Sequence, residues 1–215
     1  MSLSHSLPRE LTRPVHVGGV QIGGGAPVVV QSMTCTDTAD AQATLGQVRA
    51  LAQAGCDIVR VSVPTEAALE GFRTICAESP VPIVADIHFN PKAADAAAQV
   101  VEKVRINPGN YVDSKIFNIR EYSDEEYNAG IAKIRERFIP FLHLCKEHNS
   151  AIRLGINHGS LSDRIMSRYG DTPEGMVASC MEFLRICREE NFHNVAISIK
   201  ASNTVVMVQT VRLLV

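Results

Sequence analysis

The chain of 215 residues is 46% hydrophobic and 20% charged, and it contains 14 Gly, 10 Pro and no Trp. This composition is that of a globular protein, and it excludes a disordered or collagen-like chain. The 21 basic and 23 acidic residues give a formal net charge of −2, so no bulk positive charge indicates nucleic acid or an anionic membrane as a partner. Any cationic site must therefore be local.

The cysteines and the apolar runs indicate the compartment. The six cysteines form no C-x-x-C pair, and most lie in apolar segments of the sequence. This pattern predicts reduced, mostly buried thiols and not a disulfide framework or a zinc site. The N-terminus lacks the apolar core of a signal peptide, and no run approaches the roughly 20 apolar residues of a membrane span. We expect a soluble, cytoplasmic protein.

In chain order, a polar N-terminal segment (1–14) precedes two short β-rich runs around Gly18-Gly19, which predict a hairpin. Apolar, β-branched runs then alternate with helical patterns. The predicted strands are Pro27–Gln31, Asp57–Val63, Pro82–His88, Lys103–Asn107, Ala151–Asn157 and Asn194–Lys200. The predicted helices lie near Asp40–Ala54, Thr65–Ala77, Pro91–Val101, Asp124–His148 and Thr172–Glu190, and a last one begins after Ser202 and runs to Val215. Thr65, Asn90 and Thr172 are the predicted helix caps.

This alternation predicts an α/β protein with a parallel sheet, either doubly wound or closed as a (β/α)₈ barrel. No G-x-G-x-x-G follows a strand, and every strand from the second onward ends in polar residues; both features favour a TIM barrel. The sequence contains six predicted strands of the eight that a closed barrel needs, and it ends inside a predicted apolar helix. We therefore expect residues 15–215 to be a partial TIM-barrel domain of a longer protein, whose open sheet edges predict aggregation in isolation.

Strand periodicity places polar side chains on one face of five consecutive strands. Side chains two or four positions apart on a strand share a face, and the carboxyl ends of barrel strands carry active sites. The groups are Arg60 with Ser62, Asp86 with His88, Arg105 with Asn107, Arg153 with Asn157, and Ser198 with Lys200. The sequence therefore predicts a site inside the carboxyl end of the barrel.

Four of these residues are cations, and Asp86 is the one carboxylate among them; the cations are Arg60, Arg105, Arg153 and Lys200. Each cation alone could simply pair with a carboxylate. As a group they would be costly, because two like charges ~8 Å apart repel by about 2 kcal/mol at an effective dielectric near 20. Guanidinium groups bind phosphate oxygens in bidentate geometry. We predict a small, multiply charged anion, a diphosphate, as the ligand.

The neutral and acidic members of the group leave alternatives open. Asp86 and His88 could form an acid–base pair, although hydrogen bonding to substrate hydroxyls is favoured. Asn107 and Asn157 suit hydroxyl or phosphate oxygens, or they cap loops as Asx turns. No nucleophile elbow, H-E-x-x-H or P-loop is present, so we assign no metal ligand and no certain catalytic residue.

Several runs resemble the signature blocks of 4-hydroxy-3-methylbut-2-enyl diphosphate synthases. The blocks are Gln31-Ser32-Met33-Thr34, Val59–Pro64, Ala85–Phe89 and Arg105–Asn110, and the runs Tyr111–His148, Gly155–Met166 and Ile199–Asn203 are similar to the large, three-domain form. The resemblance implies a TIM barrel followed by a separate domain with a [4Fe-4S] cluster. It also implies reductive ring opening of 2-C-methyl-D-erythritol 2,4-cyclodiphosphate in isoprenoid biosynthesis, with electrons from ferredoxin or flavodoxin.

The family pattern also implies roles for single residues. The diphosphate ligands would be Arg60, Arg105, Arg153 and Lys200, and the polar groups around the substrate would be Asp86, His88, Asn107 and Asn157. The cluster ligands, three Cys and a Glu, are expected beyond Val215. The fragment alone is then expected to supply diphosphate binding and to be inactive.

Two other functions remain open. A metal-free, phosphate-binding barrel transferase of the dihydropteroate-synthase type would need no cysteine-rich domain. A non-catalytic module would bind the anionic metabolite without iron or a reductant. The sequence also leaves open a homodimer, and a plastid location beside a bacterial cytoplasm.

Overall fold

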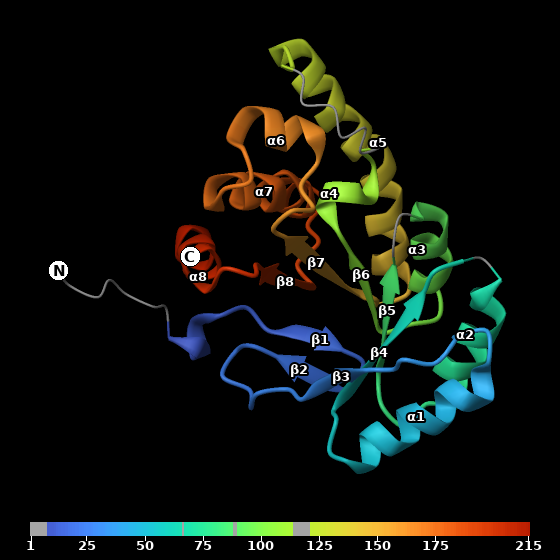
Figure 1. Cartoon of the computed structure of the whole chain (residues 1–215). Coiled ribbons are helices and arrows are strands. Elements are labelled where there is room, and N and C mark those ends of the chain that lie inside the picture. Colours follow the sequence, from blue (N-terminus) through green and yellow to red (C-terminus); the bar gives the residue numbers. More distant parts are fainter. Residues whose placement is uncertain (1–7, 66, 88–89, 114–120) are drawn as a thin grey trace.

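A six-stranded parallel sheet forms the centre of the molecule in the computed structural model, which describes residues 8–65, 67–87, 90–113 and 121–215. Its order is β3-β4-β5-β6-β7-β8, so each strand pairs with the next strand along the chain (Figure 1). The strands are β3 (Gln31–Met33), β4 (Ile58–Val63), β5 (Ile83–Ile87), β6 (Lys103–Ile106), β7 (Ala151–Asn157) and β8 (Val195–Lys200). This unbroken order is that of a TIM-barrel wall, because the order of a doubly wound sheet reverses at a switch point.

Helices connect the strands and bury the apolar face of the sheet. They are α1 (Ala41–Gln53), α2 (Ala68–Glu78), α3 (Pro91–Ala98), α4 (Pro108–Tyr111), α5 (Asp124–Glu147), α6 (Asp163–Tyr169), α7 (Pro173–Glu189) and α8 (Thr204–Leu214), after a short 3₁₀ helix at Arg9–Leu11. Alternate residues of β4 and β7, such as Val61 and Leu154, are buried in the main core beneath these helices. The polar residues between them must therefore face the other side, the inside of the barrel wall.

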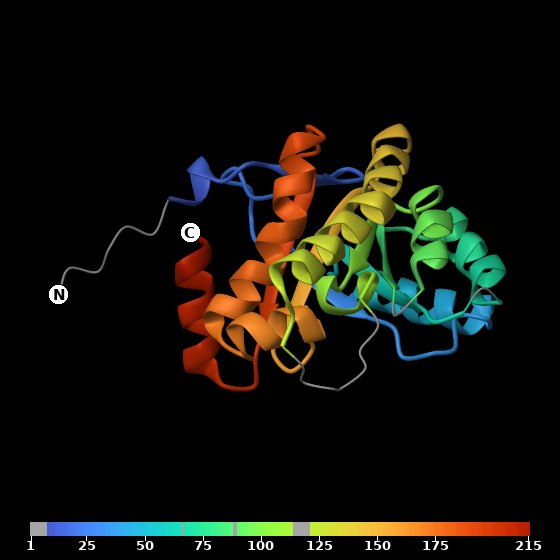
Figure 2. The ribbon, with the colours of Figure 1, turned by 90° about the horizontal axis from the view of Figure 1, so that it is seen from above.

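The predicted hairpin is present as β1 (Val15–Val17) and β2 (Val20–Ile22), which pair antiparallel. Gly18 in its turn has φ +55°, a conformation that glycine adopts without strain. The hairpin lies across the sheet from α1, α2 and α3 (Figures 1 and 2). Val15 and Val17 form a second apolar cluster with Ile58, Val84 and Ala151 near the amino ends of the strands. The hairpin thus closes the amino end of the inner face.

The first strand of the sheet differs from its prediction. The ladder of β3 begins at Gln31, whereas the sequence predicts a strand over Pro27–Gln31. Val28 and Val30 are 75% and 52% exposed, and only the Val30 backbone is held, by the Asp57 carboxylate and by bonds from Asp57 and Ile58 to its carbonyl. The apolar run predicted a strand, but the side chains of Val28 and Val30 lie exposed at the sheet edge, while Val29 packs partly against the apolar cluster of the hairpin.

Two of the three predicted caps are confirmed. The Asn90 side chain accepts from the Lys92 and Ala93 amides at the start of α3, and the Thr172 hydroxyl accepts from the Gly175 amide in α7. The Thr65 prediction holds only in part: Thr65 is not the N-cap of α2, which is Ala67 without a side-chain capping bond, but the Thr65 hydroxyl accepts from the Ala68 amide at 3.4 Å at the start of the helix.

The cysteines follow the prediction of mostly buried thiols. All six are free; Cys145, Cys180 and Cys187 are buried, Cys56 and Cys76 are half-buried, and Cys35 is exposed. In the described part of the chain, no helix combines the length and the apolar character that a membrane crossing requires.

Candidate functional site

The register of the sheet brings the predicted site strands level with one another. Ser62 lies beside Asp86, Asp86 beside Arg105, and Arg105 beside Arg153. Residues in register on neighbouring parallel strands point to the same face. Four strands, β4 to β7, therefore present one row of polar side chains on the inner face.

Asp86 lies at the centre of this row and is 3% exposed. Its Oδ1 accepts from Arg105 Nη1 at 3.2 Å, and its Oδ2 lies 3.6 Å from Arg60 Nε. Arg105 Nη2 also approaches the Gly155 carbonyl at 3.5 Å, and a Cβ on Gly155 would lie 2.5 Å from Arg105 Nε. Arg105 is therefore paired with a carboxylate of the protein, Asp86. For this cation, the alternative of a simple ion pair, which the sequence left open, is present.

Arg153 is bound less completely than Arg105. Its Nη2 donates to Ser198 Oγ at 2.9 Å, and among the described residues no carboxylate forms an ion pair with it. Burial, followed by the neighbouring charges of Arg60 and Arg105, lowers the pKa of Arg153, and Asp86 opposes this effect only in part. An anion beside Arg153 would relieve the repulsion.

Arg60 also keeps capacity for a ligand. Its Nε and Nη2 donate to Met33 Sδ at 3.2 and 3.1 Å, and a thioether is a weak acceptor. Its side chain is 27% exposed, compared with 9% for Arg105. A phosphate oxygen is a stronger acceptor than the sulfur and could replace it.

At the carboxyl end, Asn157 and Lys200 lie side by side in the register of β7 and β8, and Lys200 is exposed. Asn107 is used by the protein: its Oδ1 accepts from the Gly109 amide, and its Nδ2 donates to Ser160 Oγ at 3.1 Å. The loop-capping alternative for Asn107 is therefore present. His88 lies outside the described residues.

Sequence reasoning missed Lys103, which is 2% exposed. It precedes Arg105 by two positions on β6 and so shares the inner face, in register with Val84 and Ala151. Burial, and then the charges of Arg153 and Arg60, lower the pKa of Lys103 to about 8. The strand period does predict that Lys103 faces inward, but Lys103 lies at the amino end of β6, away from the carboxyl ends where barrel sites are expected.

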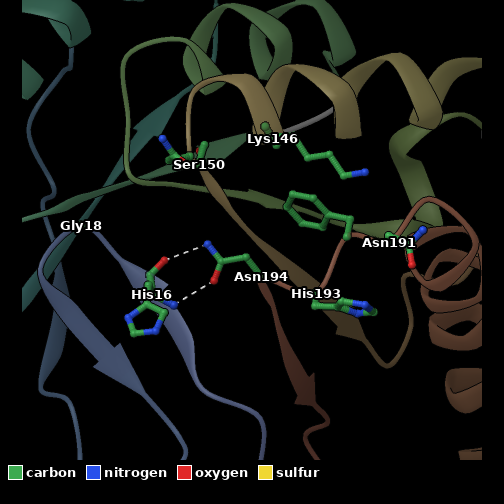
Figure 3. Close-up of a pocket in the computed structure, with 10 residues that line it drawn as sticks. His16, Gly18, Lys146, Ser150, Asn191, His193 and Asn194 are labelled. Carbon is green, nitrogen blue, oxygen red and sulfur yellow. Dashed lines mark hydrogen bonds between the residues drawn. The ribbon is translucent and has the colours of Figure 1, made fainter.

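A cavity of about 430 Å³ lies at the opposite, amino end of the sheet (Figure 3). It is lined by His16, Gly18, Cys145, Lys146, Asn149, Ser150, Asn191, Phe192, His193 and Asn194, none of which is a predicted site residue. In Figure 3, Asn194 points at the His16 backbone, to which it donates at 2.9 Å and from which it accepts at 2.8 Å. These two bonds fix the hairpin to the start of β8.

The loops after β6 and β7 touch so closely that only glycine fits between them. A Cβ on Gly109 would lie 1.8 Å from the Ser160 carbonyl oxygen. We expect Gly109→Ala to lower the free energy of unfolding by about 1–3 kcal/mol or more. Overpacking usually costs this much, and here the backbone at Ser160 must move to make room for the Cβ. Urea denaturation of the protein measures the change.

Gly46 provides the matched control for that substitution. It is exposed within α1, and a Cβ there would meet nothing within 4 Å. Gly46→Ala should therefore stabilise the protein by about 0.5–1 kcal/mol through helix propensity. Equal effects of the two alanines would contradict the close approach of the two loops.

The sequence matches the GcpE TIM-barrel domain family over residues 12–215. A relative from Parabacteroides distasonis, named 4-hydroxy-3-methylbut-2-en-1-yl diphosphate synthase (flavodoxin), is 60% identical over 213 residues, 96% of this chain and 35% of the relative. A relative of the same name from Akkermansia muciniphila is 50% identical over 96% of this chain and 36% of its own length. The chain thus spans about a third of the length of these curated relatives.

Solved structures resemble the chain at low sequence identity. A truncated 3-deoxy-D-arabino-heptulosonate 7-phosphate synthase from Thermotoga maritima has a TM-score of 0.52 at 12% identity, and the match covers 89% of this chain and 58% of that one. Such a match concerns the fold alone. The family model, in contrast, covers nearly the whole sequence, and the chain belongs to the GcpE TIM-barrel domain family.

Proposed function

We propose that this chain is the substrate-binding barrel of a 4-hydroxy-3-methylbut-2-enyl diphosphate synthase, and that its inner-face cations bind the diphosphate of 2-C-methyl-D-erythritol 2,4-cyclodiphosphate. The observation that carries the proposal is the group of inner-face cations around a single carboxylate. Arg60, Arg105 and Arg153 face one another, and Asp86 is already engaged by Arg105 and Arg60. The names of the relatives from Parabacteroides and Akkermansia support a diphosphate ligand, because they give a diphosphate as the product.

Each cation has a distinct role in this proposal. Arg105 is held by Asp86 and shapes the floor of the diphosphate site, while Arg60 and Arg153 turn their remaining N–H donors toward phosphate oxygens. Lys200, exposed at the carboxyl end, adds a charge at the mouth. Asn157 beside it offers an amide to the substrate hydroxyls. Preorganised cations of this kind both bind and orient a diphosphate.

The described residues do not fit the [4Fe-4S] cluster that the family implies. Cluster ligation requires thiolates, but Cys145, Cys180 and Cys187 are buried, and burial raises the pKa of Cys180 and of Cys187 to about 12. No group of three or more His, Cys, Asp or Glu side chains within the described ranges could hold a metal. We therefore place the cluster ligands elsewhere in the full-length protein.

Ring opening of the cyclodiphosphate consumes two electrons, so a donor is required, and we propose flavodoxin or ferredoxin. Flavodoxin appears in the names of the relatives. A metal-free transferase would need neither donor nor cluster, which makes the requirement for a reductant the property that separates the two functions.

The test uses anaerobically purified full-length protein with the cyclodiphosphate and reduced flavodoxin. We expect formation of the hydroxylated allylic diphosphate, only with the reductant, together with the visible absorption of an iron–sulfur cluster. Tight binding of the substrate with neither reductant-dependent turnover nor cluster absorption would instead favour the metabolite-binding module.

A further inference from the structure

Lys103 is the most deeply buried charged side chain of the inner face at 2% exposure, compared with 3% for Asp86 and 8% for Arg105. It lies one step toward the amino end of the sheet from Arg105, between Val84 and Ala151 in the register. Val84 and Ala151 belong to the apolar cluster that the hairpin covers. Lys103 therefore lies between the apolar cluster below it and Arg105 and Arg153 above it, level with Arg60 on β4.

The charges facing Lys103 are mostly of its own sign. Arg60 on β4 and Arg153 on β7 both act on it repulsively. Arg105 extends from the same strand, and Asp86 on β5 is already bound to Arg105 and Arg60. Among the described residues, no carboxylate forms an ion pair with Lys103. A buried lysine in this setting costs stability, and a protein that needed only to fill the space would use an apolar side chain.

We propose that Lys103 is a further cation of the diphosphate site, acting from beside Arg60 and beneath Arg105 and Arg153 to strengthen the binding of the anion. The inference rests on the proposed function and extends it to a residue deeper in the inner face than Arg105 and Arg153. Lys103 is a positioning residue: Arg105 and Arg153 lie between it and the open end, and its charge acts on the anion through a partly buried region where Coulomb interactions are strong.

This role predicts opposite effects of one substitution on stability and on binding. Lys103→Met keeps the length of the side chain and removes its charge. Without ligand, the variant should melt a few degrees higher than the wild type, because an unpaired buried cation is lost. With inorganic diphosphate as the probe, its affinity should fall by about tenfold or more, because one charge close to the anion is missing.

The pH dependence separates a charge effect from a packing effect. Because the pKa of Lys103 is lowered to about 8 in the folded protein, the unfolded chain binds one more proton between about pH 8 and about pH 10.5. Wild-type stability gains from this group as the pH rises through that window. The stabilisation by Lys103→Met should therefore be larger at about pH 7 than at about pH 10, whereas a packing effect would be the same at both.

The experiment measures melting and diphosphate titration calorimetry on the full-length wild type, Lys103→Met, Lys103→Gln and the control Lys133→Met, an exposed position on α5. The control should match the wild type in both measurements. If either neutral variant binds diphosphate as tightly as the wild type, or melts lower with no dependence on pH, the role of Lys103 is overturned. If the wild type itself does not bind diphosphate, the proposed function fails first, and the inference fails with it.

Discussion

Arg153→Ala should weaken binding of the cyclodiphosphate by about 2–4 kcal/mol, roughly 30- to 900-fold. Arg153 is the partly buried arginine of the row without a carboxylate partner among the described residues, and its bond to Ser198 Oγ leaves further donors for an anion. Removing it takes away a charge-assisted contact that is largely shielded from water. Isothermal titration of the full-length protein with the cyclodiphosphate measures the loss.

Arg49→Ala is the matched control for this substitution. Arg49 pairs with Glu78 at the surface, where both side chains are about half exposed, at 51% and 46%. Its removal should leave the affinity unchanged, because an exposed pair far from the site contributes little. An unchanged affinity in Arg153→Ala as well would remove Arg153 from the site.

Arg164→Met should lower the free energy of unfolding by about 3–5 kcal/mol, the largest effect on stability that we expect. Arg164 is 3% exposed and donates to Glu182 twice, at 2.6 and 2.8 Å. Its Nη2 also reaches Asp113 at 3.3 Å, and Glu182 accepts from the Tyr127 hydroxyl at 2.6 Å. The variant leaves the Glu182 carboxylate buried without its cation.

A double variant identifies the cause of that loss. Arg164→Met combined with Glu182→Leu should recover most of the stability, because replacing both buried ions by apolar groups is often nearly neutral. The control Arg135→Met breaks the exposed pair with Glu189 and should cost less than about 1 kcal/mol. If urea denaturation shows the double variant to be less stable than Arg164→Met, the uncompensated charge is not the cause.

This network also supports the candidate site. Asp113 follows α4, Arg164 lies in α6 and Glu182 lies in α7, so the ion pairs connect the segments that follow β6 and β7. Those segments carry Gly109 and Ser160, which meet at the carboxyl ends of the strands. The buried pairs therefore fix the edge of the proposed diphosphate site.

The parallel sheet and the row of cations could be predicted from the sequence because both depend on local periodicity. Arg60, Asp86, Arg105 and Arg153 lie on one face since alternation along a strand is a property of the backbone. The same period places Lys103 on the face of Arg105, although Lys103 lies at the amino end of its strand.

Other features depend on contacts that no local pattern contains. The pairing of Arg164 with Glu182 joins two helices, and the engagement of Arg105 by Asp86 depends on the strand register. The helices α4 and α6 are only 4 and 7 residues long, too short for a clear helical period. The exposed run at Val28 and Val30 shows the opposite case, in which a strong strand pattern lies at an uncovered edge.

The central claim is that the inner-face cations hold the diphosphate, and a crystal structure of the full-length protein with the bound cyclodiphosphate tests it most directly. We expect phosphate oxygens within hydrogen-bond distance of Arg60 and Arg153, with Arg105 still paired to Asp86 and Lys103 beneath the ligand. A diphosphate bound away from the inner face of β4 to β7, with these cations unchanged, would contradict the account.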